Sequence, residues 1–233
     1  MKLAVTAVIL ALVGTGVAHL GMVRPMQGFI LYALAMLVAL IGVIASVVGL
    51  VRARAAASSS SPSTQAGRSL LASAAVLLVL LAPLFSAGGA PRINDITTDT
   101  QDPPSFVAAA ELGPNQGRDL SYPGAGFAGQ QQGAYPDLAP ERVELAPAAA
   151  MERLRAAILE LPGARIVAYE PADGRIEATQ TSWLFRFVDD VVARVRAEGN
   201  GSVVDIRSKS RDGQGDFGVN AARIKTLLAS LHS

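Results

Sequence analysis

The chain has 233 residues, enough for one or two domains, and it is 51% hydrophobic but only 17% charged. A soluble globular chain carries about 25% charged residues, so this chain is short of charge. All 19 acidic residues lie from Asp95 onward, and the part from residue 91 holds 15 basic side chains, a net charge of −4. That balance excludes a basic nucleic-acid-binding domain. Cysteine is absent and histidine occurs twice, so we expect no disulfide, no metal site and no cofactor.

Three apolar segments occupy the first part of the chain, at residues 3–23, 29–51 and 70–90. Each exceeds the roughly 20 residues that cross a bilayer as a helix, and residues 1–90 are therefore predicted to form a membrane anchor. The first segment is also compatible with a cleaved signal peptide, because Lys2 precedes it and small residues lie near Ala18. No clear cleavage site follows and the apolar run continues to Val23, which favours a retained helix.

The arginines beside these segments predict the orientation. Arg52, Arg54 and Arg68 lie between the second and third segments, whereas the opposite short loop carries only Arg24. Basic residues mark cytoplasmic loops, so the N-terminus is predicted in the cytoplasm. We expect a multi-pass protein of a bacterial inner membrane with a periplasmic C-terminal domain. Its expected partners are the lipid bilayer and other membrane or envelope proteins, and no nucleic acid.

Residues 91–147 are rich in Pro, Gly, Gln and Ala, and no period of 2 or 3.6 persists. Apolar residues recur along this segment at intervals, from Ile93 to Leu138. The segment is therefore predicted to be extended and packed on the following domain. Its glutamine run, Gln130–Gln132, is expected at an exposed loop tip.

Residues 148–233 show regular periodicity. Met151, Leu154 and Ile158 share one helical face. Four alternating segments follow, at residues 165–170, 175–182, 188–196 and 202–210, and a last helix is expected to begin at Asn220. The predicted fold is α+β: a four-stranded antiparallel meander sheet flanked by two helices, with one face buried and the other solvated.

Several stretches of this half resemble one family. They are PRINDITTDTQDPPSF at residues 91–106, YPDL at 135–138, IEATQTSWLFRFVDDVVARVR at 176–196 and VVDIRSKSRDGQGDFGVNAARI at 203–224. They are similar to the bacterial and chloroplast family catalogued as domain of unknown function 1499. The resemblance implies a membrane-attached or exported domain, and it implies no activity and no catalytic residue.

Two strands change from apolar to small polar residues toward one end, and this pattern suggests a ligand pocket. Its expected lining is Gln180, Ser182, Trp183, Ser208 and Ser210. The alternative is a strand end that meets solvent.

Three further clusters have a functional and a structural interpretation. The glycine-rich residues 212–220 precede a helix, so Arg211 and Arg223 are candidates for binding an anion there; the alternative is a tight connection capped by Asn220. The Asp and Thr residues of 95–102 are candidates for calcium, but turns bonded to their own backbone are the favoured interpretation. Asp189 and Asp190 are adjacent in a strand, so they are expected on opposite faces, one paired with an arginine.

These patterns favour a non-catalytic, envelope-facing domain for ligand or protein binding. Two alternatives remain open: a hydrolase that uses Ser and carboxylates, and an accessory subunit of a membrane complex.

Overall fold

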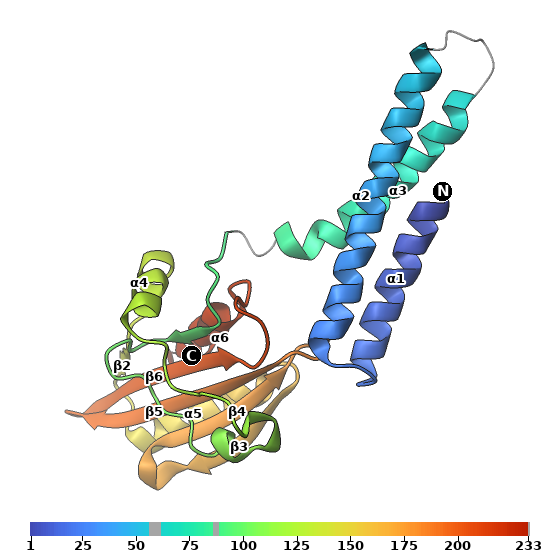
Figure 1. Ribbon diagram of the computed structural model, residues 1–233. Helices are drawn as coiled ribbons and strands as arrows, with labels where there is room; N and C mark the ends of the chain where they lie inside the picture. Colours follow the sequence, from blue (N-terminus) through green and yellow to red (C-terminus); the bar gives the residue numbers. More distant parts are fainter. Residues whose placement is uncertain (56–61, 86–88, 233) are drawn as a thin grey trace. The chain divides into compact units, whose positions relative to one another are not determined.

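The computed structural model describes residues 1–55, 62–85 and 89–232 (Figure 1). It divides into two compact units, which are described separately. The first consists of Met1–Gly88 and Leu184–Arg186, and the second of Gly89–Trp183 and Phe187–Ser233.

Three helices build the first unit: α1 (Lys2–His19), α2 (Pro25–Ala55) and α3 (Pro62–Phe85). Each contains a stretch that is long and apolar enough to cross a membrane, at residues 2–19, 25–55 and 64–82. These three apolar helices are the ones that the sequence predicts.

Glycines allow the helices of this unit to approach closely. A Cβ atom added at Gly14 of α1 would lie 2.7 Å from the Leu31 Cβ and 2.8 Å from the Gly28 carbonyl oxygen of α2. Such contacts are available only to small residues, which membrane helices use to pack. The same unit includes Phe185, whose ring meets Phe29 and Tyr32 edge-on with centroids 5.5 Å apart in both pairs.

The second unit is α+β, and its antiparallel sheet has six strands where the sequence predicted four. The strands are β1 (Asp95–Thr97), β2 (Glu141–Val143), β3 (Ala164–Glu170), β4 (Arg175–Thr181), β5 (Val188–Glu198) and β6 (Gly201–Ser210). Strands β3 to β6 form the predicted meander, and β1 and β2 both pair with β6. Asp95 faces Lys209, and Glu141 faces Val204, so the two short strands follow each other along one edge. Three residues are too few for an alternating pattern, which is why the sequence did not predict these strands.

Helices α5 (Pro147–Glu160) and α6 (Val219–Ala229) cover one face of the sheet. The hydrophobic core lies between them, with Met151 and Leu154 of α5 and Ile224 and Leu227 of α6 fully buried. Four short 3₁₀ turns complete the unit, at Ala109–Glu111, Gly113–Asn115, Pro171–Asp173 and Ser230–His232.

The other face of the sheet is covered too, which corrects the prediction of a solvated face. Figure 1 shows the green segment that follows β1 crossing the sheet before it enters α4 (Ala125–Ala134). Arg207 and Lys209, predicted to point into solvent, are 2% and 8% exposed. Sequence periodicity gives no sign of this cover, because the segment is irregular and its contacts are made chiefly by backbone groups.

Helix α4 also replaces the loop tip predicted at the glutamine run. Gln131 is buried, and its side-chain amide both accepts a hydrogen bond from the backbone of β1 and donates one to it. The Thr97 N–H donates to its Oε1 at 3.0 Å, and its Nε2 donates to the Thr97 carbonyl at 2.7 Å. The glutamine side chain thus bonds the backbone N–H and carbonyl groups that a neighbouring strand would otherwise bond.

Candidate functional site

Charged side chains line the sheet face that the helices leave free. The strand registers place residues two apart on the same face, and we call the resulting row the charged face: Glu177, Asp190, Arg194, Asp205, Arg207 and Lys209. All but Arg194 are buried. Residues 98–122, which lie over them, are called the cover segment. Buried charges are costly unless they are paired, so their partners decide what this face does.

Asp95 and Arg207 form the central ion pair. The Arg207 Nε and Nη2 donate to the two carboxylate oxygens of Asp95 at 2.8 and 2.7 Å, a bidentate arrangement. Lys209 donates to the same carboxylate at 2.8 Å. Arg207 also donates to the carbonyls of Pro104 and Leu120 in the cover segment, at 3.1 and 2.8 Å. The guanidinium therefore ties the sheet to its cover.

Two aromatic rings enclose the same guanidinium. The Phe106 and Tyr122 ring centroids lie 4.9 and 5.6 Å from the Arg207 Cζ, within the range of cation–π attraction. Burial, with the nearby Asp95 charge, raises the pKa of Tyr122 to about 12. A surface hollow of about 390 Å³ opens beside these rings.

Glu177 and Asp190 are held chiefly by groups of the cover segment and the β6 end. The backbone N–H groups of Val107, Ala108 and Ala109 donate to the Glu177 carboxylate at 3.0, 3.0 and 2.8 Å. Asp190 accepts from Arg211 at 2.6 Å and from the Asn115 side chain at 3.0 Å. These bonds pair the two buried carboxylates and fix the cover segment on the sheet.

Asp205 is the third buried carboxylate of the row. Its Oδ2 accepts from the Arg194 Nε at 3.0 Å and from Arg196 at 2.8 Å, and Arg194 also donates to Asp102 at 2.9 Å. Its Oδ1 is buried and finds no hydrogen-bond partner in the described part of the chain.

Three of the residues predicted to line a pocket lie together on the helix-covered face, and α6 reaches them. Ser208 donates to Asn220 at 2.7 Å and accepts from Arg223 at 2.6 Å, and Ser210 accepts from Asn220 at 3.0 Å. Arg223 also donates to Gln180 and, at 2.6 Å, to Asp189. These three polar side chains lie together and are bonded by side chains of α6; their role as a ligand site stays a prediction.

The other two predicted pocket residues lie apart from this patch. Ser182 and Trp183 follow β4 in an exposed loop, and Trp183 is 76% exposed. The two candidate anion-binding arginines are also separated. Arg211 pairs with Asp190 on the charged face and Arg223 with Asp189 on the helix-covered face.

The Asp and Thr residues near β1 form local turns. The Asp99 carboxylate accepts the N–H groups of Gln101 and Asp102, both at 2.9 Å, and Thr97 bonds Asp99. Asp95 is engaged by the two cations of β6. Among the described residues, no group of three or more His, Cys, Asp or Glu side chains is arranged to hold a metal ion.

The glycine-rich connection to α6 is capped by Asp216, whereas the sequence predicted Asn220. Its carboxylate accepts the N–H groups of Gly218 and Asn220 at 2.9 and 2.8 Å. The Asn220 side chain is turned to the sheet. Burial raises the pKa of the Asp216 carboxyl, against the opposing effect of these two hydrogen bonds.

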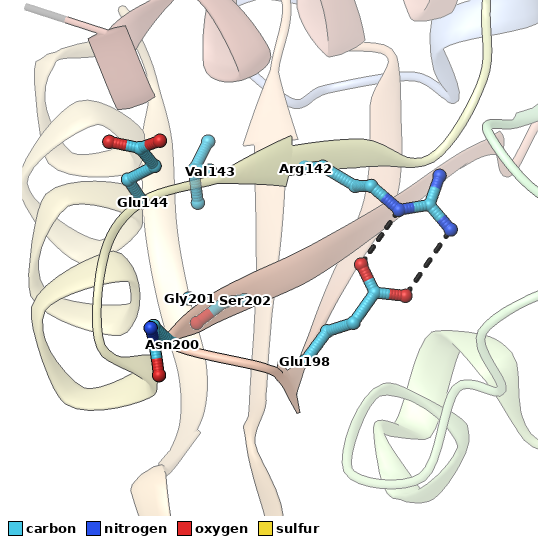
Figure 2. Close-up of a pocket in the computed structure, with 7 residues that line it drawn as sticks. All are labelled: Arg142, Val143, Glu144, Glu198, Asn200, Gly201 and Ser202. Carbon is cyan, nitrogen blue, oxygen red and sulfur yellow. Dashed lines mark hydrogen bonds and ion pairs between the residues drawn. The ribbon is translucent and has the colours of Figure 1, made fainter.

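A hollow that the sequence did not suggest lies where β2 meets the β5–β6 turn. Figure 2 shows the Arg142–Glu198 ion pair at this hollow, with donor–acceptor distances of 2.7 and 3.2 Å. Its volume is about 670 Å³, and a second hollow of about 390 Å³ shares Arg142 and Glu198 with it. The strands predicted at residues 188–196 and 202–210 imply a turn between them, but β2 was not predicted, so the hollow had no sequence signal.

Together, these features define a chain of three apolar helices and an α+β domain with a buried ionic layer under an irregular cover. The family model described as protein of unknown function (DUF1499) matches residues 95–231, more than half of the chain. The chain belongs to this family, and the predicted resemblance is confirmed. No curated protein and no solved structure matches the chain.

Proposed function

We propose that this protein is anchored in a bacterial inner membrane by α1–α3 and displays a non-catalytic binding domain in the envelope. The proposal rests on one observation: the buried carboxylates are engaged in hydrogen bonds within the domain. The described residues include six of them: Asp95, Glu177, Asp189, Asp190, Asp205 and Asp216. Each accepts hydrogen bonds from arginine, lysine or backbone N–H groups.

A hydrolase would need at least one carboxylate free to move a proton near a nucleophile. The Ser208 hydroxyl donates to an amide oxygen and accepts from a guanidinium, so it has no base as its partner. The polar groups of the domain interior therefore favour structural roles, and binding is left to the surface.

The two adjoining hollows beside Arg142 and Glu198 are the surface best suited to a polar partner. They combine an exposed ion pair with the backbone of a tight turn, and β2 contributes a short edge strand. A protein segment with both charged and amide groups matches this chemistry. Both residues lie at the sheet end opposite to the one where the chain enters β1, because β5 and β6 run the length of the sheet.

The proposed orientation in the membrane rests on the arginines. Arg52 and Arg54 end α2, and Arg68 lies in the first turns of α3. An excess of basic residues on that side supports a cytoplasmic position for the connection between α2 and α3. The N-terminus is then cytoplasmic and the domain after α3 is periplasmic.

Site-specific photocrosslinking in cells tests the binding surface. A photoreactive residue at Asn200, in the larger hollow, is expected to give a discrete adduct that Glu198→Gln weakens. The matched control is Asp173, an exposed turn residue at the same sheet end. Equal adducts at both positions, or none at Asn200, would contradict this surface. Labelling of Ser208 by a serine-reactive phosphonate would favour the hydrolase alternative.

A further inference from the structure

We propose that the loop between β4 and β5 and the loop between β6 and α6 seat the domain on the lipid bilayer, with Trp183 and Phe217 in the headgroup region. The proposal rests on the membrane attachment proposed above. It assigns a lipid-binding surface to a part of the second unit whose role the buried ion pairs do not explain.

The two loops leave the same end of the sheet. Gln180 faces Asp189, and Asp189 faces Ser210, so β4 ends, β5 begins and β6 ends side by side. The Arg211 N–H donates to the Val188 carbonyl at 3.0 Å, which holds the second loop beside the base of the first.

This end is also the one where the chain arrives from the membrane helices. The β6–α6 loop bonds the arriving residues: the Asp216 N–H donates to the Ile93 carbonyl at 3.2 Å, and Asn94 donates to the Gly213 carbonyl at 2.7 Å. Ten residue steps separate Phe85, the end of α3, from Asp95, the start of β1. A fully extended chain of that length spans at most about 36 Å, so the connection from α3 to β1 is short.

The exposed side chains at this end suit a lipid interface. Trp183 is 76% exposed, Phe217 54% and Val219 51%. Rings of tryptophan and phenylalanine partition into the boundary between headgroups and acyl chains. Arg92 and Arg186 are exposed at the same end and match the charge of lipid phosphates.

Both loops carry a residue in a backbone conformation that favours glycine. Arg186 has φ +64° and Phe217 has φ +56°. Side chains other than glycine adopt this region at a cost, and here the conformation presents Phe217 outward. Phe185, between Trp183 and Arg186, is assigned to the helical unit and packs on Phe29 and Tyr32. That aromatic pair begins the second apolar segment, and aromatic residues gather at membrane–water interfaces.

Trp183 is the only tryptophan of the chain, so its fluorescence reports on this loop alone. The full chain is reconstituted in phosphatidylcholine vesicles whose acyl chains carry bromine close to the headgroup or near the chain end. We expect blue-shifted emission and strong quenching, greatest with the shallow bromine. The control is the double variant Trp183→Phe, Asn200→Trp, which moves the reporter to the other end of β5, about 33 Å away at about 3.3 Å per residue. Its emission is expected to be red and insensitive to bromine.

Every other outcome overturns the proposal, and flotation of the vesicles separates its failure from that of membrane attachment. A chain that does not float with the vesicles contradicts the anchor itself. A chain that floats, but whose Trp183 is quenched by acrylamide and not by bromine, has the loop in water. Resistance to both quenchers shows that protein covers Trp183, and a partner or a second copy then replaces lipid as the occupant.

Discussion

Asp95 accepts hydrogen bonds from two cations of the same strand, Arg207 and Lys209, and all three are buried. Desolvation of three charges is offset only because their geometry is close and the remaining donors find backbone carbonyls. The cover segment supplies those carbonyls. The ionic layer and its cover are therefore expected to be stable together and to fail together.

Removing the Asp95 charge should be strongly destabilising. Asp95→Asn leaves two buried cations without their counter-ion, and loss of one partner from a buried pair costs about 3–5 kcal/mol. Asp137→Asn is the matched control, since it removes an exposed partner of Lys225 and should change little. Urea unfolding of the full chain in detergent, followed by circular dichroism, gives the free energies. Equal effects of the two variants would contradict a structural role for the layer.

Asp216 should make stability depend on pH. Burial raises its pKa above the ordinary value of 3.8, so at a pH between the unfolded and the folded pKa the folded chain holds a proton that the unfolded chain has released. The stabilisation is then fully present below pH 3.8 and is lost as the pH rises through the raised pKa. As the pH rises from 3.8 through the raised pKa, we expect the wild type to lose stability relative to Asp216→Asn. A difference that stays constant with pH, measured by the same unfolding experiment, would show that Asp216 titrates normally.

At the scale of elements, close packing of α1 on α2 depends on position. A Cβ at Gly14 meets α2, whereas one at Gly16 has no atom within 4 Å. Gly14→Ala should overpack the contact and cost about 1–3 kcal/mol. Gly16→Ala should be neutral or slightly stabilising, because alanine is favoured over glycine in a helix. Unfolding of the full chain in sodium dodecyl sulfate measures both, and a larger loss at Gly16 would contradict this packing.

The elements with strong periodicity were predictable from sequence, and those without it were not. The apolar helices, α5, α6 and the meander β3–β6 each repeat a pattern over many residues. Strands β1 and β2 are three residues long, and α4 is rich in Gly and Gln, so local sequence patterns do not predict these three elements. Their structure is set by tertiary bonds, such as those from Gln131 to the backbone of β1.

The candidate site was predictable only in part, for a related reason. Alternation brought Gln180, Ser208 and Ser210 to one face. It did not predict that Arg223 of α6 bonds them. A spacing of three residues places Asn220 and Arg223 on the same face of a helix, but it does not predict which part of the sheet that face contacts. The ion pairs of the charged face join residues about a hundred positions apart, beyond any local signal.

The molecule as a whole joins three apolar helices to a domain rich in buried charge. The family match begins at Asp95 and ends at Leu231, inside the second unit. The three apolar helices lie outside the match, so the proposed attachment to a membrane rests on their length and apolar composition. The partner proposed for the two hollows and the lipid contact proposed for the two loops both require the whole domain to lie on one side of the membrane.

Cysteine labelling in intact cells tests that central claim most directly, because the chain contains no cysteine of its own. Asn200→Cys places a thiol in the domain, and Ser60→Cys places one between Arg54 and Arg68. With the outer membrane made permeable, a membrane-impermeant maleimide should label the first variant at once and the second only after the inner membrane is lysed. Labelling of Ser60→Cys alone would reverse the orientation, and equal labelling of both before lysis would contradict an anchor that separates them.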